Sequence, residues 1–157
     1  MDAHQRSDLT QTPLLGMPPA GENTSPQTLT VAQARDSVQR LLYAHYDATR
    51  TAPAKTEVQD ALLVTSELVT NAVRHGGGLA AFSADVEHGE LLLRITDNNP
   101  APPGPADDTD IDRPGGFGWA LANRLCRALS VRPLPGGDGK TIVAHFPLGT
   151  QTDAHEA

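Results

Sequence analysis

The chain has 157 residues, of which 38% are hydrophobic and 20% charged, so one globular domain with a sizeable core is expected. The formal net charge is −7, and the 12 Lys and Arg residues are scattered, which argues against direct nucleic-acid binding because such binding favours a basic stripe. No apolar run approaches the roughly 18–20 residues of a membrane span, and no secretory signal is visible. Its single cysteine, Cys126, excludes an intrachain disulfide, so we expect a cytoplasmic protein without membrane attachment.

The two ends of the chain differ in composition from its middle. Residues 1–28 contain four prolines among polar residues and show no helical or strand period, which predicts a disordered tail. Residues 149–157 are mostly polar and are expected to be frayed. The predicted domain therefore covers residues 29–148.

Two helices are expected first in chain order. Thr30 and Gln33 have the spacing of a capping box, and apolar residues then recur at helical intervals until about residue 47. The same capping spacing begins again at Thr56, where a second helix is expected to run over residues 56–75 until three glycines end it. Apolar side chains occupy most of the circumference of this second helix, so we expect it to be central and largely buried.

A third helix and four strands are expected after these two helices. A loop rich in Asn, Pro, Asp and Gly separates the second strand from the third helix, and loops of that length are usually functional. Cys126 falls in the apolar pattern of this helix and is expected in the core. The order predicts an α+β fold, a two-layer α/β sandwich with helices on one face of a mixed, mostly antiparallel sheet. The elements are, in chain order, strand 79–86, strand 90–96, helix 119–128, strand 129–132 and strand 140–146.

A carboxylate and an amide stand on the otherwise apolar second helix. Glu67 and Asn71 are four residues apart and therefore share one side of the helix, where burial without partners is costly. One interpretation gives Asn71 the role of an oxygen ligand to Mg²⁺ and Glu67 that of a proton acceptor. The alternative is a partly solvated helix face shared with Ser66, Thr70 and Arg74.

Two further features border the long loop. Asp97 ends a predicted strand, where its carboxylate could accept a hydrogen bond from an exocyclic amine such as that of adenine; the alternative is an Asx-turn. Glycines within residues 115–118 directly precede the third helix, so the backbone could approach an anion at the helix N-terminus. The alternative for these glycines is a flexible hinge.

One apparent phosphate-binding motif is rejected. Gly139-Lys140-Thr141 matches the end of a P-loop, but Leu134 occupies the place of the first glycine. The stretch also joins two predicted strands instead of opening a helix, so no Walker A site is expected.

The order of these features resembles the Bergerat-fold (GHKL) ATPases over roughly residues 30–147. Residues 66–76 closely resemble the N-box of that family, in the version found in bacterial anti-sigma-factor serine/threonine kinases of the RsbW and SpoIIAB type. Asp97 falls where the family has its adenine-binding aspartate, and residues 115–118 fall at the glycines that close the ATP lid. Thr141 falls in the last family box.

The resemblance implies a role for each matching residue. Glu67 would be the general base toward a substrate serine or threonine, and Asn71 would bind Mg²⁺. Asp97 would accept from the adenine amine, supported by Thr141, and we count Asn99 among the nucleotide-binding candidates. The family motif after the aspartate, D-x-G-x-G, is absent here because asparagines follow Asp97, a departure that bears on the adenine-pocket geometry and on turnover.

The resemblance also implies a phosphate end for the site. Arg113 is the one cation of the lid, so we expect it to contact the γ-phosphate, the alternative being a solvated loop charge. The other candidates of the phosphate end are Arg74, His75, Gly116, Phe117 and Gly118.

The resemblance implies a kinase that uses ATP and Mg²⁺ to phosphorylate an anti-anti-sigma (STAS-type) partner and that binds a sigma factor. A homodimer is expected because relatives commonly form dimers. The alternative function is a non-catalytic, nucleotide-dependent protein-binding module with a degenerate ATPase site. A histidine-kinase fragment is less favoured, because no phosphoacceptor helix hairpin precedes the N-box.

Overall fold

Three helices and four strands make up the part of the chain that this computed structural model describes, residues 29–103 and 118–149. The predicted tail 1–28, and all of the predicted tail 149–157 except its first residue, lie outside that part. No helix in the described ranges is both long and apolar enough to cross a membrane. The elements are α1 (Val31–Thr49), α2 (Glu57–Arg74), β1 (Leu79–Glu87), β2 (Glu90–Asp97), α3 (Gly118–Leu125), β3 (Ala128–Pro133) and β4 (Lys140–Pro147).

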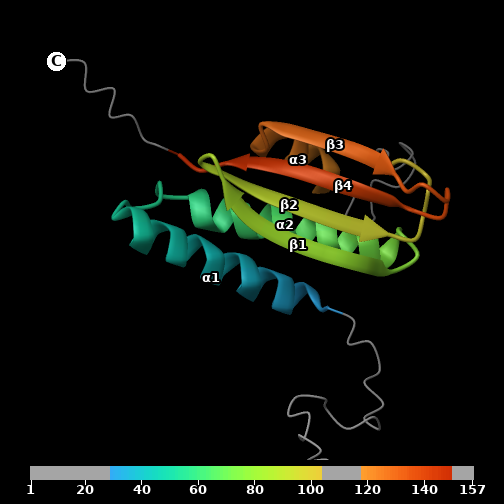
Figure 1. Cartoon of the computed structure of the whole chain (residues 1–157), viewed down its shortest axis with the longest axis horizontal. Helices are drawn as coiled ribbons and strands as arrows, with labels where there is room; N and C mark the ends of the chain where they lie inside the picture. The colour runs from blue at the N-terminus through green and yellow to red at the C-terminus, as the bar shows by residue number, and fades with distance from the viewer. Residues whose placement is uncertain (1–28, 104–117, 150–157) are drawn as a thin grey trace, which may run out of the picture.

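The four strands form one sheet in the order β1-β2-β4-β3 (Figure 1). Each neighbouring pair is antiparallel, so the sheet of the described residues is antiparallel throughout, where the sequence predicted a mixed and mostly antiparallel one. A tight turn joins β1 to β2, and His88 (φ 51°) and Gly89 (φ 74°) supply the positive φ angles that such hairpin turns require. The last strand, β4, lies between β2 and β3, which brings its first residue, Lys140, opposite Asp97 at the end of β2.

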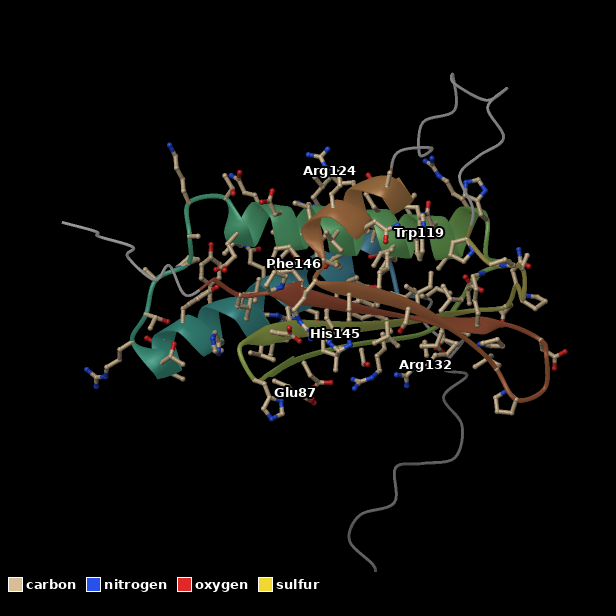
Figure 2. The ribbon with its side chains drawn as sticks, turned by 90° about the horizontal axis from the view of Figure 1, so that it is seen from above. Glu87, Trp119, Arg124, Arg132, His145 and Phe146 are labelled. Carbon is tan, nitrogen blue, oxygen red and sulfur yellow. The ribbon has the colours of Figure 1, made fainter. Side chains whose placement is uncertain are left out.

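The helices cover one face of this sheet, so the predicted two-layer α+β architecture is confirmed. α2 contacts both α1 and α3 and is the central helix of the layer, as its nearly continuous apolar surface predicted. Alternate residues of β2 point into the core, where Leu91, Leu93 and Ile95 are fully buried. Figure 2 shows Glu87, Arg132 and His145 on the side of the sheet away from α2 and α3.

The two predicted capping boxes have different outcomes. At the start of α1 the box is present, with the Thr30 hydroxyl and the backbone N–H of Gln33 joined at 3.1 Å. At the start of α2 the side chain of Thr56 makes no cap hydrogen bond, and its hydroxyl donates to the Asp60 carboxylate at 3.1 Å instead. Thr56 has φ −111° and ψ −1°, in the helical region, whereas the capping residue Thr30 has the extended backbone typical of a cap, with φ −82° and ψ 160°.

The third helix ends earlier than predicted, at Leu125 instead of near residue 128. The backbone N–H of Arg127 donates to the carbonyl of His145 in β4 at 2.7 Å, and this bond begins the pairing of β3 with β4. Cys126 therefore lies just after the helix, half-buried against the core. Burial raises the pKa of its thiol to about 11.

Candidate functional site

The second half of α2 carries the predicted pair Glu67 and Asn71. Both residues are half-buried and lie one turn apart on the same side of the helix. Neither side chain forms a hydrogen bond or ion pair within the described residues. The Ser66 hydroxyl, by contrast, donates to the carbonyl of Leu62 in the same helix at 2.8 Å and accepts from Arg35 of α1 at 2.6 Å. Ser66 thus takes part in the contact between α1 and α2, whereas the polar atoms of Glu67 and Asn71 could bind a ligand.

Gly118 brings the start of α3 against Glu67. A Cβ atom at Gly118 would lie 2.3 Å from Oε2 of Glu67, so only glycine permits this approach without a shift. The first turn of a helix carries N–H groups without intrahelical partners and a partial positive charge. The Glu67 carboxylate and this helix end therefore border the same space.

Asp97 is buried at the end of β2 and is paired with Lys140 of β4. The Lys140 ammonium lies 3.0 Å from each carboxylate oxygen, and the two side chains are only 5% and 3% exposed. The backbone N–H of Asn99 also donates to Asp97, at 3.0 Å, which is the Asx-turn that the sequence left as an alternative. Asp97 is therefore held as a hydrogen-bond acceptor from two directions.

The end of α2 lies directly against this aspartate. A Cβ atom at Gly76 would lie 2.5 Å from Oδ2 of Asp97, so the backbone passes the carboxylate at the closest possible range. The carbonyl of Gly76 accepts the backbone N–H of Asn98 at 2.8 Å. The Asn99 amide donates to the carbonyl of His75 at 2.8 Å and accepts from the N–H of Ala101 at 2.9 Å. The asparagines that follow Asp97 thus tie the end of β2 to the end of α2.

Thr141 and Lys140, which are neighbours at the start of β4, lie on opposite faces of the sheet. The hydroxyl groups of Thr141 and Thr96 lie 2.7 Å apart, directly across the β2–β4 pair. Because side chains alternate along a strand, these threonines lie on the sheet face opposite to Asp97. The structure thus brings Lys140, and not Thr141, to the aspartate.

Lys140 is the site residue that the sequence analysis did not assign. In the sequence it was considered only as part of a rejected P-loop. The pairing register of β2 and β4 would have indicated Lys140, because Asp97 at the end of β2 lies directly opposite Lys140 at the start of β4.

The remaining predicted residues belong to the phosphate end. Arg74 and His75 are exposed at the C-terminal end of α2. Arg113, Gly116 and Phe117 lie outside the residues that the structure describes, so their predicted roles stay predictions.

Glu67 lies in α2 and Gly76 lies two residues after its end. They are nine residues apart, or about 13 Å at the rise of an α-helix, a length that an extended nucleoside triphosphate spans. One end offers a buried acceptor, Asp97, and the other offers the carboxylate of Glu67 and the amide of Asn71 beside a helix N-terminus. An acceptor for a base amine at one end and oxygen ligands for a cation at the other are the donor set that a purine nucleotide with its cation requires.

The model of a known protein family matches most of the chain. Residues 25–146 match the histidine kinase-like ATPase domain. The chain belongs to this family. Members of this family bind ATP, typically with Mg²⁺, and all residues of the site lie within the matched range. This ATPase domain is also similar in structure to the Acinetobacter baumannii histidine kinase AdeS, with 19% sequence identity and a TM-score of 0.39. That similarity covers 75% of this chain and 64% of the AdeS chain. No curated protein sequence matches the chain.

Proposed function

We propose that this histidine kinase-like ATPase domain is an ATP-dependent regulator of the anti-sigma-factor serine/threonine kinase type. The observation that carries the proposal is the free Glu67 carboxylate, half-buried one turn from Asn71 and in contact range of the start of α3. This carboxylate makes no hydrogen bond within the described part of the chain, so it is available to accept a proton from a bound substrate. The RsbW-like N-box over residues 66–76 supports this type of kinase within the family.

The adenine end of the proposed site is built around Asp97. Its ionised carboxylate accepts hydrogen bonds only, which suits the exocyclic amine of adenine. The ion pair with Lys140 and the Asx-turn from Asn99 hold the carboxylate in one orientation. Gly76 brings the backbone at the end of α2 directly against this carboxylate.

The phosphate end depends on local positive charge, because the chain as a whole carries a formal charge of −7 and repels an anionic ligand. The side-chain oxygen of Asn71 would bind Mg²⁺, a cation that prefers oxygen ligands and neutralises phosphate charge when bound. The N-terminus of α3 at Gly118 would contribute free N–H groups. Arg74, His75 and the predicted lid residue Arg113 would contribute donors around the phosphates.

The proposed reaction is phosphoryl transfer to a hydroxyl group of a partner protein. Glu67 takes the proton from a serine or threonine hydroxyl, whose oxygen forms a bond to the γ-phosphorus while the bond to the ADP oxygen breaks. We propose an anti-anti-sigma protein of the STAS type as the substrate and a sigma factor as the second partner. We further propose that the protein acts in the cytoplasm, as a homodimer.

Calorimetry with ATP, with and without Mg²⁺, tests the binding part of this proposal. We expect Mg²⁺-dependent binding that Asn71→Ala abolishes, that Asp97→Asn weakens but leaves measurable, and that the control Glu87→Gln on the outer sheet face leaves unchanged. Absence of ATP binding in the wild type would remove the proposal altogether.

The kinase part is tested with radiolabelled ATP and a purified STAS-domain protein. Glu67→Gln should keep ATP affinity within a few-fold and lose phosphate transfer by about 10²-fold or more, the usual contribution of a general base. Transfer at the wild-type rate in Glu67→Gln would refute the assigned role of this residue.

The second candidate function is a non-catalytic module that binds a partner protein according to its nucleotide state. The asparagine contacts that pin the end of β2 to the end of α2 favour it, because the family's glycines at that place give a more mobile backbone. Such a module would bind ATP and show no Glu67-dependent phosphorylation. The Glu67→Gln experiment therefore separates the two candidates.

A further inference from the structure

The buried ion pair between Asp97 and Lys140 has no explanation in stability. Taking two charges out of water is costly, and a well-packed apolar pair at such a position is often equally stable or more so. The neighbouring inward-facing pair of the same two strands, Ile95 and Ile142, is apolar and almost fully buried. The sheet therefore accommodates apolar residues one step away from the place where it carries two charges.

The contacts of Lys140 show what the pair does to the aspartate. The ammonium group has three N–H donors. Three acceptors surround it, namely the two carboxylate oxygens of Asp97 at 3.0 Å and the carbonyl of Asn99 at 2.8 Å. These contacts use the whole donor capacity of Lys140, so none is left for a bound base. Lys140 compensates the charge of Asp97 and holds the turn that follows it.

Without that compensation the chemistry of the carboxyl group would change. A carboxyl group buried without a positive partner favours its protonated form. The protonated form donates a hydrogen bond, whereas the ionised form only accepts. The 6-amino group of adenine donates, and the 6-oxo group of hypoxanthine only accepts. A positive charge beside Asp97 therefore favours a 6-amino group over a 6-oxo group as the partner of the carboxylate.

We propose that Lys140 is the positioning residue that makes this site selective for 6-aminopurine nucleotides over 6-oxopurine nucleotides. It acts through Asp97, since its ammonium group contacts both carboxylate oxygens and holds the side chain against Gly76. This inference rests on the proposed ATP-binding function and adds to it the residue that determines base selectivity.

The test compares the affinities of ATP and inosine triphosphate by calorimetry in the presence of Mg²⁺. The wild type should prefer ATP by about tenfold or more, as expected for one hydrogen bond to a charged group. Lys140→Met, which has similar length and no charge, should reduce this preference to about equal binding. Lys140→Arg keeps the charge and should keep most of the preference. A packing role alone would weaken both nucleotides equally and leave their ratio unchanged.

A double variant covers the case in which Lys140→Met fails to fold. Asp97→Asn combined with Lys140→Met removes both charges, so it should fold and should show the same ATP-to-ITP ratio as Asp97→Asn alone. A different ratio in the double variant would overturn the inference. An unchanged ratio in a folded Lys140→Met would also overturn it, while leaving the proposed ATP site intact. If the wild type binds neither nucleotide, both the inference and the proposed function are wrong.

Discussion

Replacing Gly76 by alanine tests the close approach on which the adenine end of the site depends. The new Cβ would lie 2.5 Å from Oδ2 of Asp97 and 2.6 Å from both Cβ and Cγ of the same side chain. Contacts with the inner carbons of a short side chain are not relieved by rotating its tip. Either the end of α2 must move away from β2, or Asp97 must leave its position opposite Lys140.

The loss of stability depends on whether the end of α2 shifts or Asp97 leaves its position. A backbone shift of this kind corresponds to overpacking, which costs about 1–3 kcal/mol. Loss of the partner of a buried charge is more severe, about 3–5 kcal/mol. We therefore expect Gly76→Ala to lower the free energy of unfolding by about 1–5 kcal/mol. At about 4 °C per kcal/mol for a domain of this size, the melting temperature should fall by about 4–20 °C.

The assay combines thermal unfolding with ATP titration, and Gly89→Ala is the matched control. Gly89 has a positive φ of 74° and no atom within 4 Å of an added Cβ, so alanine there is destabilising through backbone conformation only, by about 1 kcal/mol. The hairpin that contains Gly89 lies at the opposite end of β2 from Asp97, so ATP affinity should survive in the control and be lost in Gly76→Ala. A Gly76→Ala variant with wild-type melting temperature and ATP affinity would refute the described packing.

Three further predictions concern parts of the molecule away from the site. The buried Glu57 carboxylate accepts the Tyr46 hydroxyl and the backbone N–H of Gly149. Glu57→Ala should lower the urea-unfolding free energy by about 1–3 kcal/mol, because the buried Tyr46 hydroxyl loses its acceptor, and a change below about 0.5 kcal/mol would contradict this. The hydrogen bond from Arg127, followed by that from His145, lowers the pKa of Glu90 from 4.5 to about 2, so its contribution to stability is present above about pH 4.5 and is lost as the pH falls toward 2. Urea midpoints measured between pH 5 and pH 2.5 should therefore drop more steeply in the wild type than in Arg127→Gln, and parallel curves would refute the coupling. The Cys126 thiol, with its pKa raised to about 11 by burial, should react with iodoacetamide at pH 8 at least about tenfold more slowly in the folded protein than in urea, and equal rates would show that the thiol is accessible and ionised.

The helices and strands were largely predictable because their signals are local. The apolar periodicity of α2 and the alternation of Leu91, Leu93 and Ile95 in β2 follow directly from the sequence. The end of α3 was not predictable in this way, because a hydrogen bond from Arg127 to His145 of a later strand stops the helix. Tertiary contacts of this kind override an apolar pattern that could continue for another turn.

The residues of the site were likewise predictable where a local motif indicates them, and not where they depend on contacts between distant parts of the chain. Glu67, Asn71 and Asp97 were predicted from motifs that each lie within one element. The partner of Asp97 was missed because it depends on the register between β2 and β4, which joins residues 43 positions apart. Thr141 was expected to support Asp97 because of the family resemblance, whereas the observed register pairs Asp97 with Lys140 and Thr141 with Thr96.

The two ends of the site are held in different ways, and this difference has measurable consequences. Asp97 is fixed by strand pairing, an ion pair, an Asx-turn and the close approach of Gly76, so its environment is also part of the fold. The side chains of Glu67 and Asn71 are positioned by α2 without hydrogen bonds to other described residues. Substitutions at the adenine end should therefore change stability and affinity together. Substitutions of Glu67 or Asn71 should change transfer or affinity while leaving stability unchanged or higher, since a partly buried carboxylate or amide without a partner is unfavourable for folding.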